Sequence, residues 1–493
     1  MAIIDQSTPT GALTYSLLQD VYLEKVINNK PQADKVLSQM KTKKWFGGKQ
    51  CKYLTQVSNG GNFGTDWATI KANPTNGALN LEWAMEPFAV DGQFEIGMPD
   101  LVATEDRGAY MGALENNMSA CFDGLAKTLA LFYYGGRSGV IGRLGATVDG
   151  TNTSVTVATS NTFVVNSSTA IKMTLGTRFV VAQGDTPGTD VAYPESTLLG
   201  GNTTPVVFTV TAKKGTTITA SASVTGGTIY AYDILELYTA RSGSSFYGME
   251  GIADIIPYWG NRGEGTGNTL ATQYASYIGT NFRGLDRSQM EYELSGQFAS
   301  AYGRTSATPL QDTLVDLLDD VTTNGAVDSI CPINAETYRQ VASEAGIQLK
   351  AAANSGDDKN RVTAGVSKLN LAFEDAFING LIPSAYVPNG VAWIYDADDA
   401  TLLDQNGAVD TILNKVGNDS LGKYEIADVG SAGISKDPMS MGVNLNKLFT
   451  ITEGAGNRVG PTLNVAAHIF GNFMLQKTAS SGVAHLNVSE LYI

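Results

Sequence analysis

The stretch PDLVATEDRGAYMGALENNMSACFDGLAKTLALFYYGG, residues 99–136, decides the fold class. Its apolar residues recur every three or four positions, which is the spacing of one helical stripe. The stripe consists of Met111, Leu114, Met118, Phe122, Leu125, Leu129 and Phe132. Pro99 suits a helix start, and Gly135 and Gly136 can end a helix in the left-handed conformation. A helix over the whole stretch would be about 55 Å long, several times the usual length.

Three glycines inside this stretch leave two interpretations open. Gly108, Gly112 and Gly124 either weaken the helix or mark places where another backbone approaches it closely. In the first case the stretch is an ordinary core helix that is frayed or kinked near Gly108.

The residues before the helix predict an extended β-hairpin over 50–98. Lys52–Val57 alternate, and so do residues 78–85, where Leu79, Leu81, Trp83 and Met85 share one face. About twenty Gly- and Asn-rich residues connect the two strands, an unusually long connection for a compact domain. Because an isolated hairpin is marginally stable, its apolar face needs a covering surface. That surface belongs either to the same subunit's core or to a neighbouring subunit.

Residues 147–235 form a compositional island of short β-branched runs separated by Gly, Asn and Pro. Such punctuation predicts a small β-barrel or sandwich. Because helical patterns flank the island, we expect an all-β domain inserted into a larger one.

The remaining chain alternates helix and strand patterns. Leu310, Leu314, Leu317, Leu318 and Val321 predict one apolar helix face. The strand DSICPI follows, and a second helix is expected to open near residue 334. Residues 391–395 predict a buried strand that an acidic turn stops, and the tail predicts strands that close a sheet. The overall class is therefore α+β.

Composition excludes several functional classes. The chain has 493 residues with 43% hydrophobic and 16% charged residues, and its net charge is −15. No dense Lys/Arg run provides the basic patch of a phosphate-contacting nucleic-acid binder. The three cysteines are far apart, which indicates neither a metal motif nor a disulfide framework and suits a reducing cytosol. We expect neither a signal peptide nor a membrane span.

Residues arranged for catalysis, cofactor binding or metal binding are scarce, and we predict none of these sites and no enzymatic activity. His468 and His485 each lie in an apolar, strand-like setting without a nucleophile motif or second ligand. Gly263–Asn268 has closely spaced glycines but no Lys-Ser/Thr after them, so a flexible loop is the better interpretation. Asp396–Asp399 begins like a calcium loop, but Thr401 replaces the required glycine.

The order of these elements resembles the major capsid proteins of tailed double-stranded DNA bacteriophages, which have the Hong Kong 97 capsid fold. The resemblance rests on DVYLEKVINNKPQADKVLSQMKTKKWFGGKQCKYLTQV for the arm and loop entry, on 99–136 for the spine helix, on YGMEGIADIIPYWG for the peripheral domain and on GLIPSAYVPNGVAWIYDADD for axial-domain strands. It spans nearly the whole chain through weakly specific motifs.

The resemblance implies a division of the chain into segments. They are an N-terminal arm (1–49), an extended loop (50–98), a peripheral domain with the spine helix (99–146), an inserted β-domain (147–235), a return through the peripheral domain (236–310), an axial domain (311–460) and C-terminal strands closing the sheet (461–493).

The resemblance also implies self-assembly. Subunits would form hexamers and pentamers of an icosahedral head, assembled in the host bacterial cytoplasm, around double-stranded DNA held without sequence-specific contacts. A scaffolding protein, a portal and decoration proteins are the partners it suggests, and no membrane is involved. Some relatives join subunits through a Lys–Asn bond, but nothing around Lys71 marks such a partner.

In this interpretation the hairpin lies across a neighbour's spine helix. The interface candidates are Trp67, Leu79, Leu81, Trp83 and Met85 in the hairpin and Met111, Met118 and Phe122 in the helix. Trp83 packed inside its own chain would count against it. The alternatives are an encapsulin-like nanocompartment with protein cargo, a glycan-binding or hydrolytic protein with a β-sandwich module, and a phage tail or decoration protein.

Overall fold

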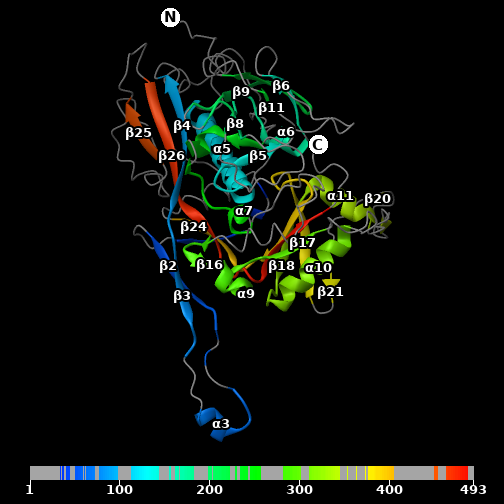
Figure 1. Cartoon of the computed structure of the whole chain (residues 1–493). Helices are drawn as coiled ribbons and strands as arrows, with labels where there is room; N and C mark the ends of the chain where they lie inside the picture. Colours follow the sequence, from blue (N-terminus) through cyan, green and yellow to red (C-terminus); the bar gives the residue numbers. More distant parts are fainter. Residues whose placement is uncertain are drawn as a thin grey trace, which may run out of the picture. The chain divides into compact units, whose positions relative to one another are not determined.

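The structure is a computed structural model with mixed helix and sheet (Figure 1). It describes residues 34, 36–37, 40–44, 50–58, 60, 63–72, 77–97, 113–143, 155–156, 162–165, 167–182, 198–201, 204–222, 228–229, 234–242, 245–256, 281–300, 310–344, 352–353, 362–363, 372–373, 376–404, 449–453 and 462–486. The chain divides into two units. Unit 1 comprises Met1–Trp45, Phe88–Ala130 and Leu403–Gly471, and unit 2 comprises Phe46–Pro87, Leu131–Leu402 and Asn472–Ile493.

Unit 1 contains an antiparallel sheet around the long strand β26 (Thr462–Leu475). β25 (Phe449–Glu453) and β4 (Phe88–Gly97) both pair with β26, and β1 (Lys41–Lys44) and β24 (Ala400–Asp404) extend the same sheet. Helix α5 (Ala113–Gly135) begins in this unit. A Cβ atom at Gly92 of β4 would lie 2.9 Å from Cys121 Sγ of α5, so the missing side chain lets strand and helix approach closely.

The predicted helix is present from Ala113 to Gly135, about 35 Å at 1.5 Å per residue. Its expected first half, 99–112, lies outside the described residues, as does most of the expected arm, 1–49. The helix ends as the sequence predicts, because Gly136 has a positive φ of 68°.

The predicted hairpin is formed by β2 (Cys51–Gln56) and β3 (Asn80–Met85), which are antiparallel in unbroken register. Its connection contains a short helix, α3 (Trp67–Ala72), and leads away from the rest of unit 2 (Figure 1). The hairpin is shorter than the predicted 50–98, because residues 88–97 form β4 in the other unit.

The Thr-rich region of unit 2 builds a six-stranded antiparallel sheet of order β5-β12-β8-β9-β10-β7. Its strands are β5 (Val140–Arg143), β7 (Thr162–Val164), β8 (Arg178–Ala182), β9 (Val207–Lys214), β10 (Thr217–Ala222) and β12 (Ile234–Leu237), with α6 (Ser167–Lys172) between β7 and β8. Stacked and edge-on rings of Phe163, Phe179 and Phe208 fill its core.

This architecture differs from the predicted barrel or sandwich. The described strands form one open sheet, beside the small pair β6 (Val155–Thr156) and β11 (Thr228–Ile229). The sheet also exceeds the predicted bounds, 147–235, because β5 lies before them and β12, which pairs with β5, ends after them. The division into units keeps this sheet within unit 2.

Short elements connect this sheet to the rest of unit 2. They are η1 (Tyr238–Ala240), β13 (Arg241–Ser242), β14 (Ser245–Phe246), α7 (Ile252–Ile255), β15 (Asn281–Phe282), β16 (Leu285–Asp286), η2 (Arg287–Gln289) and α9 (Glu291–Leu294).

The second six-stranded sheet of unit 2 has the order β17-β27-β23-β18-β22-β21. Its strands are β17 (Gln297–Ser300), β18 (Ser329–Asn334), β21 (Ala372–Phe373), β22 (Ala376–Ser384), β23 (Val391–Asp396) and β27 (Ser481–His485). The C-terminal strand β27 lies between β17 and β23, as the prediction of a sheet-closing tail requires. The pair β19 (Ala352–Ala353) and β20 (Val362–Thr363) lies outside this sheet.

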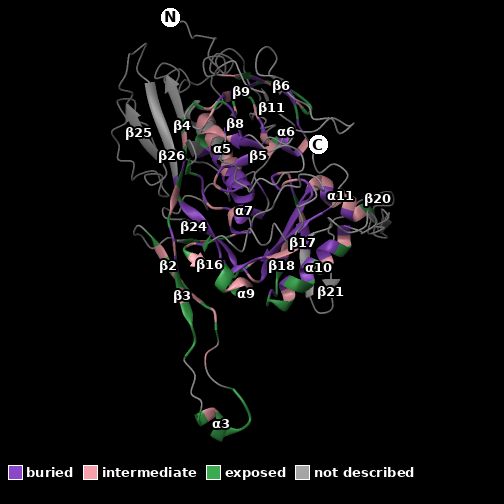
Figure 2. Cartoon of the chain, viewed as in Figure 1, coloured by how far each residue is buried: buried purple, intermediate pink, exposed green. Residues whose placement is uncertain are grey.

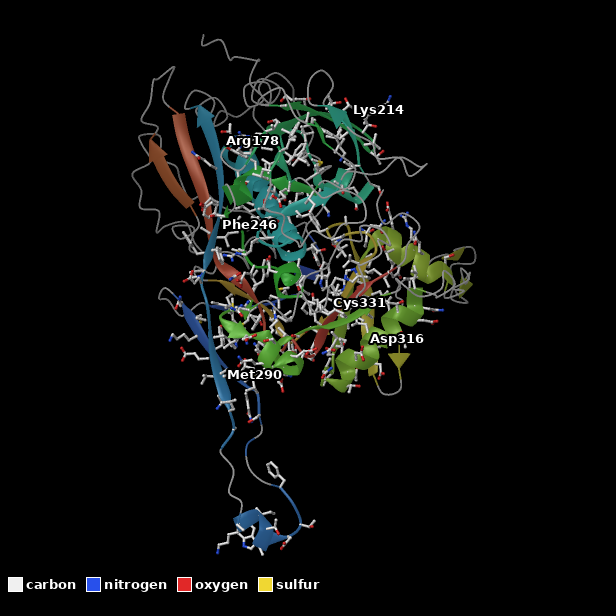
Figure 3. The ribbon with its side chains drawn as sticks, viewed as in Figure 1. Arg178, Lys214, Phe246, Met290, Asp316 and Cys331 are labelled. Atoms are coloured by element: carbon white, nitrogen blue, oxygen red, sulfur yellow. The ribbon has the colours of Figure 1, made fainter. Side chains whose placement is uncertain are left out.

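Helices α10 (Leu310–Thr323) and α11 (Ala335–Glu344) accompany this sheet. The predicted face of α10 is buried in the core cluster together with Cys331 and Ile333 of β18. Figure 3 shows Cys331 among the strands and Asp316 on α10. Asn334 Oδ1 accepts the backbone N–H of Glu336 at 2.9 Å, which explains why α11 opens where the sequence predicts.

Candidate functional site: the hairpin and its anchor

The hairpin Cys51–Met85 changes from exposed to buried along its length (Figure 2). Among its described residues, Trp83 is the first on the path from the tip back to the base that is fully buried. We call residues 57–79 the tip. The tip and the strand next to it expose four large apolar side chains: Leu54 at 70%, Phe63 at 80%, Trp67 at 72% and Leu79 at 46%.

The alternating pattern of β3 is confirmed, but the residues on its apolar face are more exposed near the tip and buried near the base. Leu79 is exposed and Leu81 half-buried, whereas Trp83 and Met85 are only 4% and 2% exposed. The prediction that Trp83 and Met85 face a neighbouring subunit is therefore wrong, and by the criterion set for Trp83 the base of the hairpin forms no interface. Both side chains are buried within the chain itself, and Phe282 and Arg283 of unit 2 cover Trp83 at the base of the hairpin.

Trp83 lies in an aromatic stack at the hairpin base. Its ring stacks on Tyr53 across the two strands at 4.7 Å between centroids and meets Phe282 edge-on at 5.8 Å. The indole N–H donates to Thr55 Oγ1 at 2.7 Å, which satisfies its one polar atom. Burial is the main cause that raises the pKa of Tyr53, so its phenol stays protonated.

A buried arginine completes this base. The guanidinium Cζ of Arg283 lies 4.6 Å from the Trp83 ring centroid and 5.1 Å from that of Phe282. Its Nη2 forms an ion pair with Glu250 Oε2 at 3.2 Å and donates to Phe473 O at 3.3 Å. Burial lowers the pKa of Arg283, and the Glu250 carboxylate opposes that shift.

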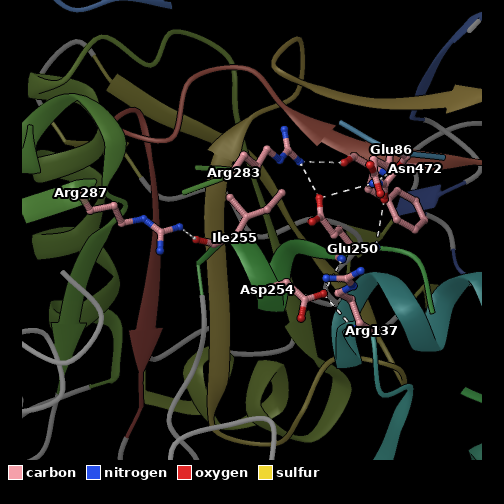
Figure 4. Close-up of polar contacts among 10 residues, drawn as sticks. Glu86, Arg137, Glu250, Asp254, Ile255, Arg283, Arg287 and Asn472 are labelled. Carbon is pink, nitrogen blue, oxygen red and sulfur yellow. Dashed lines mark hydrogen bonds and ion pairs between the residues drawn. The ribbon is translucent and has the colours of Figure 1, made fainter. Parts of the chain in front are cut away.

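Asn472 joins the hairpin's exit to the same group (Figure 4). Its Nδ2 donates to the backbone oxygen of Glu86 at 3.1 Å, and its Oδ1 accepts the backbone N–H of Glu250 at 3.0 Å. We call Tyr53, Trp83, Glu250, Phe282, Arg283 and Asn472 the anchor. All of them belong to unit 2.

Asp254 supports the segment that carries Glu250. Its Oδ2 accepts the backbone N–H groups of Gly251 and Arg137, each at 2.9 Å (Figure 4). Burial is the main cause that raises the pKa of Asp254 to about 7, and the nearby Glu250 carboxylate adds to the shift.

The sequence analysis missed the body side of the anchor. Arg283, Glu250 and Asn472 are far apart in the chain and carry no shared pattern. The one available signal is Arg-Gly between the short runs Asn281–Phe282 and Leu285–Asp286, since a glycine there favours a two-residue hairpin turn.

The helix candidates remain predictions. Met118 and Phe122 lie in α5, but the structure does not describe their side chains, and Met111 lies outside the described residues.

The structure describes several of the residues that the sequence analysis considered for chemistry. His485 is buried in β27, and burial lowers its pKa to about 4. Asp396 Oδ2 accepts the backbone N–H groups of Val327 and Asp328, and its Oδ1 accepts that of Asp398 at 2.9 Å. His468 lies in β26 opposite Asp91 in the register, and Gly263–Asn268 lies outside the described residues.

Two searches of the described residues give further findings. No group of three or more His, Cys, Asp or Glu side chains in them could hold a metal ion. None of the helices described combines the length and the apolar character needed to cross a bilayer.

Comparison with known proteins gives structural similarity without sequence relatives. No family model matches the chain, and neither does any curated protein. Among solved structures, the cyanophage A-1(L) capsid asymmetric unit is similar at 11% identity with a TM-score of 0.47, over 96% of this chain and 98% of that chain. The capsid of a native GTA particle is similar at 9% identity with a TM-score of 0.42, over 99% and 100%. A structure from Mycobacterium phage Ogopogo has 10% identity and a TM-score of 0.38, over 98% and 99%.

Proposed function

We propose that this chain is a major capsid protein that assembles with copies of itself into the head of a tailed bacteriophage. In this proposal the tip of each hairpin docks on a neighbouring subunit, and the shell closes around double-stranded DNA. The proposal rests on the geometry of the hairpin and on the element order that the sequence resemblance predicts: an extended loop, a long helix, a β-rich region and an α+β domain with a late strand closing its sheet.

The single observation that carries the proposal is the exposed apolar tip. Phe63 and Trp67 lie on a two-stranded projection in which α3 has no buried residue. A ribbon of two strands is marginally stable in water without a covering surface. Such side chains on a projecting arm are explained by a partner that covers them.

The free energies of burial and of association favour an assembly with many weak contacts over a single strong contact. Burying the four exposed side chains of the hairpin would contribute about 6–12 kcal/mol, at about 1.5–3 kcal/mol each. Association alone costs roughly 4–15 kcal/mol. One docked hairpin therefore gives a marginal dimer, whereas a closed ring or shell, in which every subunit gives and receives a hairpin, gains stability with each added copy.

The receiving surface in this proposal is the neighbour's spine-helix segment, residues 99–136, with Met111, Met118 and Phe122 as contact residues. Hexamers and pentamers, an icosahedral head, a scaffolding protein, a portal and decoration proteins complete the proposal. The β-rich region would be an inserted domain, and the acidic composition would keep the inner wall from trapping DNA.

Assembly of the purified full chain tests this function. We would measure its size by sedimentation velocity and image it by negative-stain electron microscopy, and compare it with the double variant Phe63→Ser/Trp67→Ser. Closed shells from the unaltered chain and unassembled, folded subunits from the variant are expected. The matched control is Leu175→Ser, which removes an equally exposed apolar side chain, 69% exposed, outside the hairpin and should still assemble.

Four results would contradict the proposal. One is a monomer at all concentrations, with or without a candidate scaffold, and a second is unaltered assembly of the double variant. Shells that carry protein cargo in place of DNA would favour a nanocompartment. Hydrolytic activity of a monomer that is lost on Asp396→Asn would favour an enzyme.

A further inference from the structure

The turn between β15 and β16 holds an arginine in an unfavourable backbone conformation. Its two residues, Arg283 and Gly284, have φ angles of 48° and 92°, which is the pattern of a two-residue turn with both φ values positive. Glycine, asparagine and aspartate are the usual residues at the first position. Among the described residues, Arg283 is the one residue other than glycine with a positive φ.

The contacts of Arg283 explain why an arginine occupies this position. From the turn, its side chain reaches the Trp83 ring of the hairpin and the Glu250 carboxylate and Phe473 oxygen of the body, meaning unit 2 without the hairpin. The guanidinium is planar, so it can stack on the ring and form polar bonds with its edge at the same time. The left-handed backbone conformation aims the side chain between these groups.

The neighbouring arginine of the same region differs in this respect. Arg287 donates to the backbone oxygens of Ile255 and Leu294, and its Cζ lies 5.3 Å from the Phe282 ring. These three partners belong to the body, and Figure 4 shows the bond to Ile255. Arg283 thus contacts hairpin and body with one side chain, beside the ring contact of Trp83 with Phe282 and the bond from Asn472 to Glu86.

We propose that Arg283 is a positioning residue that fixes the direction in which the hairpin leaves the body. Its unfavourable backbone conformation is retained because it places the guanidinium between Trp83 and Glu250. The inference rests on the proposed assembly function for its purpose, since a hairpin held at one angle can meet every neighbour in the same way, but the positioning itself is a property of one subunit.

Substitution by glycine separates this role from a role in the turn alone. Glycine adopts positive φ without steric cost. If Arg283 mattered only for the turn, Arg283→Gly would keep or raise the melting temperature and leave the hairpin in place. If Arg283 positions the hairpin, the same variant frees the hairpin although the turn becomes easier to form. Arg283→Lys keeps the charge near Glu250 but loses the planar stack, so it should free the hairpin in part.

The experiment measures the distance between tip and body in the unassembled subunit. Spin labels are attached through ketone-bearing amino acids at positions 65 and 319, both exposed and both in unit 2, and pulsed electron resonance gives the distance distribution. The unaltered chain should give a single narrow peak. Arg283→Gly should lose that peak while its circular dichroism stays native.

A second variant and a control keep the test decisive. Glu250→Gln removes the same ion pair from the body side and should also broaden the distance distribution. This variant provides the test if Arg283→Gly fails to fold. Lys52→Ala removes the exposed ion pair with Glu82, which lies on the opposite face of the ribbon from the neighbouring anchor residues Tyr53 and Trp83, and should leave the peak unchanged. An unchanged peak in folded Arg283→Gly would overturn the positioning role.

Electron microscopy of the same preparations separates this inference from the proposed function. Folded Arg283→Gly subunits with a broadened distribution should lose closed shells. If the unaltered chain shows a narrow peak but never assembles, the assembly function is overturned and the positioning role stands.

Discussion

At the scale of single residues, two tryptophans of one hairpin have opposite environments. Trp67 is 72% exposed in α3, whereas Trp83 lies between Tyr53, Phe282 and Arg283. Both tryptophans lie in short segments in which apolar and polar residues are mixed. Their exposure differs because they lie at different distances from the base of the hairpin, and the rest of unit 2 covers only the base.

Replacing each tryptophan by alanine should therefore give opposite results. Trp83→Ala removes a buried ring and should lower the free energy of unfolding of the subunit by about 3–5 kcal/mol. Trp67→Ala should change it by less than about 0.5 kcal/mol, because the side chain is exposed, yet should weaken assembly. Urea titrations of unassembled subunits give the first quantity and sedimentation velocity the second. Equal destabilisation by both changes would show that the tip is covered within the subunit.

His485 gives a second prediction at this scale. Burial lowers its pKa from the ordinary 6.5 to about 4, so the folded state resists its protonation. The unfolded chain binds a proton at this residue below about pH 6.5. Stability is thus fully present above that pH and is lost as the pH falls through 4, by about 3 kcal/mol in all.

Substitution by glutamine should flatten this part of the acid response. The free energies of unfolding of the unaltered chain and of His485→Gln are compared between pH 7 and pH 4. Their difference should shrink or change sign toward pH 4 by about 3 kcal/mol, since carboxylates contribute equally to both proteins. A pH-independent difference would mean that folding leaves the pKa of His485 at its unfolded value, which would contradict the effect of burial.

At the scale of elements, two glycines show how helices meet their surroundings. A Cβ atom at Gly482 of β27 would lie 2.6 Å from Leu317 Cδ1 of α10 and 2.7 Å from the backbone oxygen of Gln297 in β17. This position therefore lets α10 pack closely on the sheet. Gly124 of α5 is the opposite case, with open space where a side chain would begin.

Alanine should destabilise the subunit at the first position and stabilise it at the second. Gly482→Ala forces strand and helix apart and should cost about 1–3 kcal/mol of unfolding free energy. Gly124→Ala should add about 0.5–1 kcal/mol, because glycine inside a helix is unfavourable. Thermal and urea unfolding measure both, each serving as the control of the other. Assembly that fails in Gly124→Ala despite a more stable subunit would indicate that a neighbouring chain approaches there.

At the scale of the whole molecule, charge bears on what a shell of this protein would do to its contents. The chain has 48 acidic against 33 basic residues. Phosphate-driven DNA binding requires clustered Lys and Arg, whose contacts release counterions and make the affinity fall with salt.

Assembled particles should therefore show no salt-sensitive affinity for duplex DNA. Opened shells or assembled sheets are incubated with linear DNA at low and at physiological salt, and co-sedimentation is measured. The expected result is little binding at either salt concentration. Strong binding at low salt that disappears at higher salt would reveal a basic inner surface and contradict the proposed repulsive wall.

Sequence patterns were sufficient to predict those elements whose secondary structure depends on local spacing and local hydrogen bonds. The buried face of α10, the strand β23 and its acidic turn, the start of α11 at Asn334 and the paired strands of the hairpin all follow from local spacing and local hydrogen bonds. Spacing fixes which side chains share a face. It also predicted that Leu81, Trp83 and Met85 share one side of β3, in agreement with the alternating burial of that strand, whereas Leu79 lies before the strand.

Tertiary structure alone decided what covers such a face. Trp83 and Met85 are buried within the folded chain. The anchor residues Arg283, Glu250 and Asn472 come from separate parts of the sequence and meet only in the folded chain. The tertiary structure likewise places β27 between β17 and β23. In the Thr-rich region the described strands form one open sheet and not the predicted barrel or sandwich. Periodicity describes one segment at a time, whereas burial and ion pairing depend on which distant segment arrives opposite it, and the sequence carries no local mark of that partner.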